Sequence, residues 1–296
     1  MSGLPTAKPS FVHLARSLAK TYAAVFFSHS PWIGAWFAAL TWWTPRAALG
    51  GLTGLFAAAL WARLFQLPTS GRLHLVNGLL CGLVIGAFHS LDGAYFLWIV
   101  LAALFSTLLA HWLAALFWKT THLPVLSLPF VLACWAVFLA WQVNAPSALP
   151  ASALAVSDPL APWPWLDRFF VSIGWLLLIP YPAAGALVFA GILAASRYLG
   201  LLAAAGYATG TLTVHLLGGN DATSLAFNFS LVAMALGGFF AVPGRASFLT
   251  ALAAGPSLPE PEDWLPAMCG DAFERAFADP EDQAQALRSL QARLKL

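Results

Sequence analysis

Charged side chains are scarce in this 296-residue chain, where Asp, Glu, Lys and Arg together make up 9% and hydrophobic residues make up 60%. A soluble domain carries about 25% charged residues, which supply its polar surface. The low charge therefore excludes a soluble globule of this length. It also excludes a disordered chain, which combines low hydrophobicity with high net charge. The composition indicates a protein that buries its surface in a lipid bilayer.

Acidic residues are fewer than basic residues up to residue 254, with four Asp and Glu against ten Lys and Arg. Residues 255–296 reverse the ratio, with eight acidic and four basic residues, so we expect them to form a hydrophilic acidic tail. The net charge of +2, without a basic cluster, excludes nucleic-acid binding.

Cysteine occurs three times without a paired spacing, so the sequence predicts neither a disulfide framework nor a metal site. The seven His residues have no metal-like spacing and no acidic partner. A phosphate-binding loop of the kind that ATP-driven pumps need is missing as well. We therefore expect a protein that is not an enzyme and that uses no cofactor and no metal.

Long apolar runs take the place of these features. A helix needs about 20 apolar residues to cross a bilayer. Eight runs are candidates for such helices, at about 23–43, 47–66, 74–90, 94–117, 124–143, 169–194, 199–217 and 223–241. Several are short or contain Gly and Pro, which is typical of helices that enter the membrane only halfway and line a cavity. The expected fold class is all-α, a polytopic membrane helical bundle.

The distribution of Lys and Arg predicts the orientation of the bundle. With the N-terminus in the cytoplasm, eight basic residues lie on the cytoplasmic side and only Arg46 and Arg168 lie outside. Five spans precede residue 145, so the spans after it would enter the membrane with the opposite orientation.

Two stretches of the second half are similar to stretches of the first. Residues 26–32 align with 169–175 at an offset of 143, and residues 77–88 align with 228–239 at an offset of 151. The bundle is therefore expected to contain two inverted repeats, with chance similarity of apolar helices as the alternative. Inverted repeats are typical of channels and transporters, in which the substrate site lies between the halves near the midplane.

The spans carry no charged residue in the middle of a strong apolar run, which favours a passive route for a neutral polar solute over an ion carrier. Such a route needs apolar walls and a few oxygen atoms that replace the water of the solute. The double phenylalanines at 26–27 and 169–170 can supply walls. Pro124 and Pro129 can free backbone carbonyls, or can simply mark the start of a helix.

Together these residues resemble the bacterial urea transporters over about residues 15–254. The resemblance rests on the double phenylalanine with the following Pro31-Trp32-Ile33-Gly34, on the segment 77–83, and on the run 123–130. In that run, Leu123-Pro124-Val125-Leu126-Ser127 is similar to the family's Leu-Pro-X-X-Thr signature, and Ser127 keeps a hydroxyl group.

The resemblance implies a homotrimer in the bacterial inner membrane, in which each protomer conducts urea passively through its own pore between the inverted halves. Urea would pass as a dehydrated plate between aromatic and aliphatic side chains, while oxygen atoms accept its N–H groups. The residues that the resemblance assigns to this pore are Phe27, Val76, Leu80, Ser127, Asp167, Phe170, Phe227 and Leu231.

The sequence also departs from the family pattern. Ala24 stands where a polar partner of Asp167 is expected, and Val76 replaces an expected Phe. At the offset of 151, the last two spans of the first half fall on residues 242–294, which carry the charged tail, so the second repeat is expected to be incomplete. The resulting segments are 1–22 as a basic cytoplasmic N-terminus, 23–143 as the first membrane repeat, 144–165 as a Pro- and Ala-rich linker outside the cytoplasm, 166–254 as the second repeat and 255–296 as the cytoplasmic tail.

Two other functions stay open at this point. A non-conducting membrane scaffold with a partner-binding acidic tail is one, because the second repeat is incomplete. A channel for another small neutral solute, such as ammonia, formamide or water, is the other.

Overall fold

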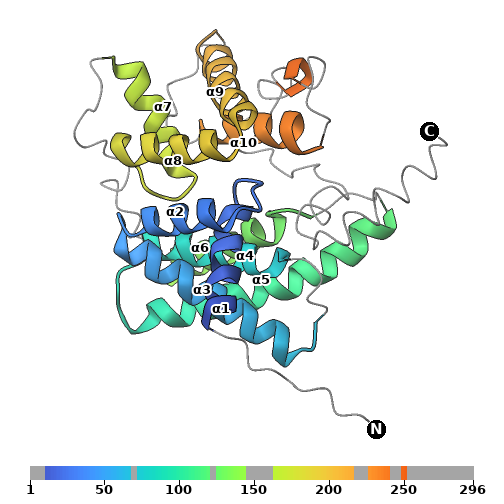
Figure 1. Ribbon diagram of the computed structural model, residues 1–296. Helices are drawn as coiled ribbons and strands as arrows, with labels where there is room; N and C mark the ends of the chain where they lie inside the picture. The colour runs from blue at the N-terminus through green and yellow to red at the C-terminus, as the bar shows by residue number, and fades with distance from the viewer. Residues whose placement is uncertain are drawn as a thin grey trace, which may run out of the picture.

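A computed structural model of the chain describes residues 11–67, 72–120, 125–144, 163–216, 226–240 and 248–251. All regular structure within these ranges is helical, which confirms the all-α fold class (Figure 1). The first group of helices comprises α1 (Phe11–Ala24), α2 (Pro31–Thr41), α3 (Pro45–Leu64), α4 (Leu73–Phe88), α5 (Gly93–Thr120) and α6 (Leu128–Asn144). The second group comprises α7 (Pro164–Trp175), α8 (Pro182–Ala195), α9 (Arg197–Leu216), α10 (Phe227–Met234) and a π-helical turn, Ala235–Phe240.

Proline marks the start of four of these helices, namely α2, α3, α7 and α8. The fixed φ of proline suits the first helical turn, where its missing N–H is not needed for the helix. Within the described residues, α3, α5 and α9 are long and apolar enough to cross a membrane, while α4, α8 and most of α6 are shorter apolar helices.

Two predicted spans, 23–43 and 169–194, are not continuous helices. The first is broken between α1 and α2, and the second between α7 and α8. Each break contains one residue with a left-handed backbone, Phe27 at φ 55° and Leu178 at φ 60°. The residue before a proline avoids the helical region, and Ser30 and Tyr181 are extended for this reason. Because α1 has 14 residues, it is about 21 Å long, shorter than the ~30 Å hydrocarbon layer.

The two breaks fix the alignment of the halves. Phe27 and Leu178 differ by 151 positions, as do the prolines that begin α2 and α8 and the residues Asn77 and Asn228 near the starts of α4 and α10. Helices α1 to α4 therefore correspond to α7 to α10. The offset of 143 expected for the double phenylalanines is wrong, because residues 26–27 occupy the place of 177–178.

Close packing within each half shows the same correspondence. A Cβ atom added to Gly34 of α2 would lie 1.7 Å from the carbonyl oxygen of Ala19, and one added to Gly185 of α8 would lie 1.7 Å from the carbonyl oxygen of Phe170. Both contacts need glycine because backbone meets backbone there. Phe170 therefore occupies the place of Ala19, and not the place of Phe27.

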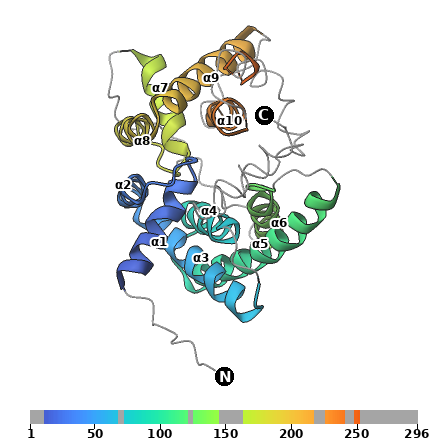
Figure 2. The ribbon, with the colours of Figure 1, turned by 45° about the vertical axis from the view of Figure 1, so that its right-hand side comes forward.

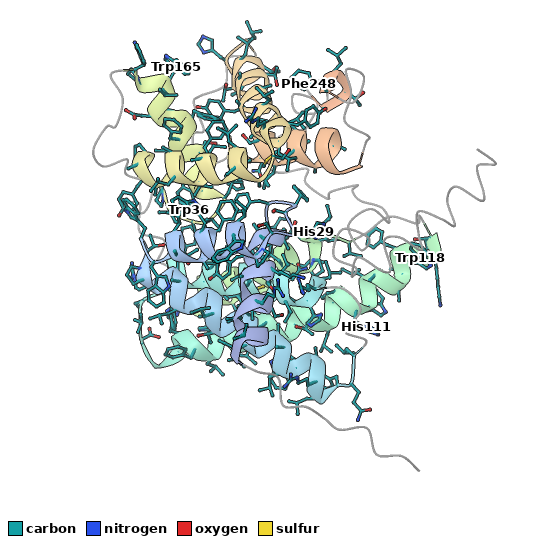
Figure 3. All side chains as sticks on the ribbon, viewed as in Figure 1. His29, Trp36, His111, Trp118, Trp165 and Phe248 are labelled. Atoms are coloured by element: carbon teal, nitrogen blue, oxygen red, sulfur yellow. The ribbon has the colours of Figure 1, made fainter. Side chains whose placement is uncertain are left out.

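The halves meet along α2 and α8, which lie side by side in both views (Figures 1 and 2). Trp36 lies at this boundary (Figure 3), and its indole Nε1 donates a hydrogen bond to the carbonyl oxygen of Leu187 at 3.1 Å. These residues are 151 positions apart, so each contacts its own counterpart. In a two-fold arrangement such a contact occurs at the axis. One hydrophobic core, with Phe26 and Phe37 on one side and Ile173 and Val188 on the other, joins the halves.

A second, smaller core lies between α4, α5 and α6, with Cys81, Tyr95, Ile99 and Cys134 among its buried members. The counterparts of α5 and α6 would fall in residues 244–295, of which only 248–251 are described. The acidic tail and most of the expected linker also lie outside the described residues. The predicted segment boundaries therefore stay predictions.

Candidate pore site

Three pairs of residues, each related by the repeat, lie on α4, on α10 and in the two helix breaks. Val76 and Leu80 lie one turn apart on α4, and Phe227 and Leu231 lie one turn apart at the same positions of α10. The two left-handed residues of the helix breaks complete the set. The pairs, which we call the slot residues, are Phe27 with Leu178, Val76 with Phe227 and Leu80 with Leu231.

Five of the six slot residues share one environment. All except Val76 are half-buried and pack against the core that joins the halves. Val76 is buried, with 4% of its surface exposed. Leu178 was missed in the sequence because the double phenylalanine at 169–170 suggested a different register. The prolines at 31 and 182, which share the offset of 151, were the available signal.

Phe170 and Asp167 lie on α7, one turn apart and away from the helix break. Phe170 belongs to an aromatic group in which its ring centroid lies 5.4 Å from that of Phe169 and 6.4 Å from that of Phe189. Asp167 is buried in the first turn of α7, where a carboxylate interacts favourably with the helix dipole. In the observed register these residues correspond to Ala19 and Arg16. The pore role of Asp167 and Phe170 stays a prediction, and the alignment at an offset of 143 no longer supports it.

Ala24, which was expected to stand where a polar partner of Asp167 belongs, has Trp175 as its counterpart in the observed register. Both residues end their helices, α1 and α7, directly before the breaks, and both are buried. The indole ring of Trp175 stacks on Phe88 of α4, with centroids 6.3 Å apart and an interplanar angle of 14°. An apolar wall therefore closes this position in the second half.

The signature turn is described from Val125 onward, while Leu123 and Pro124 lie outside the described residues. Leu126 has a left-handed backbone at φ 41°, which costs a non-glycine residue about 1–2 kcal/mol. Ser127 is exposed immediately before α6 begins. Its carbonyl oxygen accepts the backbone N–H of Val131 at 3.0 Å, so Ser127 stands at the N-terminal end of α6.

Asn77 of α4 holds this turn in place. Its side-chain nitrogen donates to the carbonyl oxygens of Leu73 at 2.8 Å and Leu126 at 3.0 Å. Its side-chain oxygen accepts the backbone N–H of Phe130 at 2.8 Å. The sequence presented Asn77 only as a landmark of the repeat, because its partners lie 49 and 53 residues away.

Metal-binding potential is low in the described ranges, where no group of three His, Cys, Asp or Glu side chains converges. The slot residues and the signature turn supply apolar side chains, one hydroxyl and backbone carbonyls. This chemistry suits a neutral solute that donates hydrogen bonds.

A polytopic helical membrane protein with a repeat-built, uncharged site belongs to the class of passive channels. The sequence matches the family model described as UT, urea transporter, over residues 15–257. The chain therefore belongs to the urea transporter family, and no curated protein matches it. Membership confirms the expected membrane fold and a non-enzymatic channel function in urea transport.

Proposed function

We propose that urea crosses this protein through the space bordered by the slot residues. The observation that carries the proposal is that all three pairs share the offset of 151 that relates the halves, although they come from four different segments. A path at the interface of two related halves must receive counterpart residues from each, and these pairs satisfy that condition.

The slot side chains cannot conduct urea alone. Moving an amide from water into apolar surroundings without a hydrogen-bond partner costs about 2–7 kcal/mol. A barrier of 4 kcal/mol slows passage about 1,000-fold. Oxygen acceptors must therefore replace part of the hydration of urea, and we assign this role to the hydroxyl of Ser127, which is the exposed polar side chain of the signature turn.

The slot pairs are unequal in size. The counterpart of Phe27 is the aliphatic Leu178, and the counterpart of Phe227 is Val76, so each of these pairs has one aromatic ring and one branched aliphatic chain. Such walls bind a flat solute less strongly than two opposed rings do, because a contact between aromatic rings contributes about 0.5–1.5 kcal/mol beyond the burial of its area. The expected selectivity is therefore relaxed, with methylurea passing beside urea.

The assembly and orientation that we propose are a homotrimer in the bacterial inner membrane with a cytoplasmic N-terminus. The family resemblance supports the trimer, and the excess of Lys and Arg on one side supports the orientation. Exposed tryptophans, including Trp32 and Trp112, provide apolar surface for lipid or neighbouring protomers. Native mass spectrometry of the purified protein would return a trimer mass, and a monomer mass would contradict it.

Urea flux into proteoliposomes, measured by stopped-flow light scattering, tests the slot. Leu231→Trp adds a bulky ring at one slot residue and is expected to reduce urea flux to the level of empty liposomes. The matched control is Leu201→Trp, because Leu201 of α9 is 61% exposed and lies outside the slot. This control is expected to keep wild-type flux.

Two outcomes would contradict the proposal. Wild-type flux no faster than that of empty liposomes would favour a non-conducting scaffold over a channel. Full urea flux in Leu231→Trp would show that the solute takes another path. Parallel measurements with formamide, ammonia and water separate a urea channel from a general channel for small neutral solutes.

A further inference from the structure

Asn77 combines complete burial with three hydrogen bonds, two of which join α4 to the turn at the start of α6. Its exposed fraction is 0%, and both donors and the acceptor of its amide are used. A buried amide with this arrangement is satisfied only when α4 and the turn before α6 keep their observed relation. Asn77 therefore fixes one position of the signature turn.

The turn needs an external partner because its own backbone leaves groups unsatisfied. Pro129 has no N–H group, and the first N–H groups of any helix have no partner within that helix. The oxygen of Asn77 caps the N–H of Phe130 in this first turn. On the other side of Ser127, the amide of Asn77 holds the carbonyl of Leu126, whose backbone is left-handed. The two bonds thus bracket Ser127.

The contact continues along α4 and α6. Asn77 lies opposite Phe130, and one turn later the buried side chains of Cys81 and Cys134 belong to the same core. Both pairs have the same separation of 53 residues, so the two helices run parallel in register. The slot residues Val76 and Leu80 flank Asn77 on α4. One helix therefore carries both the wall of the slot and the anchor of the turn.

We propose that Asn77 is a positioning residue for permeation, which holds Ser127 so that its hydroxyl meets the N–H groups of urea at the slot. This inference rests on the proposed function. Asn77 acts through Ser127 and does not touch the solute. A residue with a purely structural role would lower stability or yield, whereas a positioning residue changes urea flux only while the Ser127 hydroxyl is present.

A double-mutant cycle in proteoliposomes tests this dependence. Ser127→Ala removes one acceptor and is expected to lower urea flux about tenfold, because one N–H group of urea loses its partner. Asn77→Asp keeps the acceptor for Phe130 and loses both donors, so it is expected to lower flux by a similar factor. The double variant is expected to be no worse than either single variant, since both changes remove the same interaction.

Tyr95→Phe is the matched control for loss of a buried hydrogen bond between helices. Tyr95 of α5 is fully buried, and its hydroxyl donates to the carbonyl oxygen of Arg46, away from the slot. This variant is expected to keep wild-type urea flux. If Asn77→Asp does not yield folded protein on gel filtration, Asn77→Ser replaces it in the cycle.

The outcomes separate the two proposals. Wild-type flux in both Asn77 variants, or a double variant whose loss is the product of the single losses, would overturn the positioning role while leaving the slot intact. A wild-type protein that does not conduct at all would overturn the slot proposal. Low flux in the Tyr95→Phe control would also overturn the positioning role, because any buried bond would then have the same effect.

Discussion

The two halves of the molecule keep the same backbone contact but distribute bulk in opposite ways. In the first half, Gly78 of α4 packs under the Cβ atom of Ala58 of α3. In the second half, the ring of Phe229 of α10, the counterpart of Gly78, fills the space above Gly210 of α9, which lies 152 positions after Ala58 because α9 begins 152 residues after α3. In both halves a glycine of one helix faces a larger residue of the other, but the glycine lies on α4 in the first half and on α9 in the second. The repeat therefore preserves helix spacing and not residue identity.

The contact between each half's first two helices offers the largest test of this comparison. Gly34→Ala and Gly185→Ala both place a Cβ atom against a backbone carbonyl, where neither partner can move aside. Overpacking costs about 1–3 kcal/mol and more where backbone must shift, so both variants are expected to lose most of their folded yield. Thermal unfolding and gel filtration measure the loss.

Gly93→Ala is the control for these variants, because an added Cβ atom there meets nothing within 4 Å. It is expected to unfold at the wild-type temperature. If only one of the two glycine variants were destabilised, the halves would not share the contact.

The exchanged sizes at Gly210 and Phe229 give the second test. Gly210→Ala alone drives a Cβ atom into the ring of Phe229 and is expected to destabilise the protein by about 1–3 kcal/mol. Adding Phe229→Gly recreates the Ala58 and Gly78 arrangement of the first half, so the two changes are expected to be coupled favourably in thermal unfolding. Simple addition of the two losses would show that the halves do not share this geometry.

The smallest expected effect lies at the boundary of the halves. Trp36→Phe removes the hydrogen bond to Leu187 and keeps most of the ring, so it is expected to cost about 0.5–1.5 kcal/mol. Trp32→Phe, at a position that is 84% exposed, is the control and is expected to leave the unfolding temperature unchanged. Equal behaviour of the two variants would contradict a specific contact at the axis.

The class of fold and the existence of a repeat could be predicted from the sequence, because apolar runs, charge distribution and similar segments are all visible in the order of the residues. The resemblance to urea transporters, which the family match confirms, was also accessible from the order of short motifs. The register of the first repeat segment was predicted wrongly, because adjacent phenylalanines at 26–27 and 169–170 match by letter while packing differently, and only the prolines at 31 and 182 indicated the offset of 151. The backbone breaks at Phe27 and Leu178 decide the register, and the residue types at these positions do not reveal a left-handed backbone.

The partners of Asn77 show a second limit of the sequence. Its neighbours on α4 indicate an apolar helix, and nothing local indicates that its amide reaches a turn about 50 residues later. Contacts of this kind depend on how helices assemble, which hydrophobic periodicity does not specify. Trp175 is similar, because its stacking on Phe88 joins the two halves.

The contact of Trp36 with its own counterpart has a consequence for how such a protein can evolve. In an assembly of two identical subunits, both subunits carry any substitution at the axis, so an indole there would meet a second indole. A duplicated and fused chain changes each copy separately, and a bulky ring can then face a leucine. The two mouths of the passage are consequently free to diverge, and each can adapt to the solution on its own side of the bilayer.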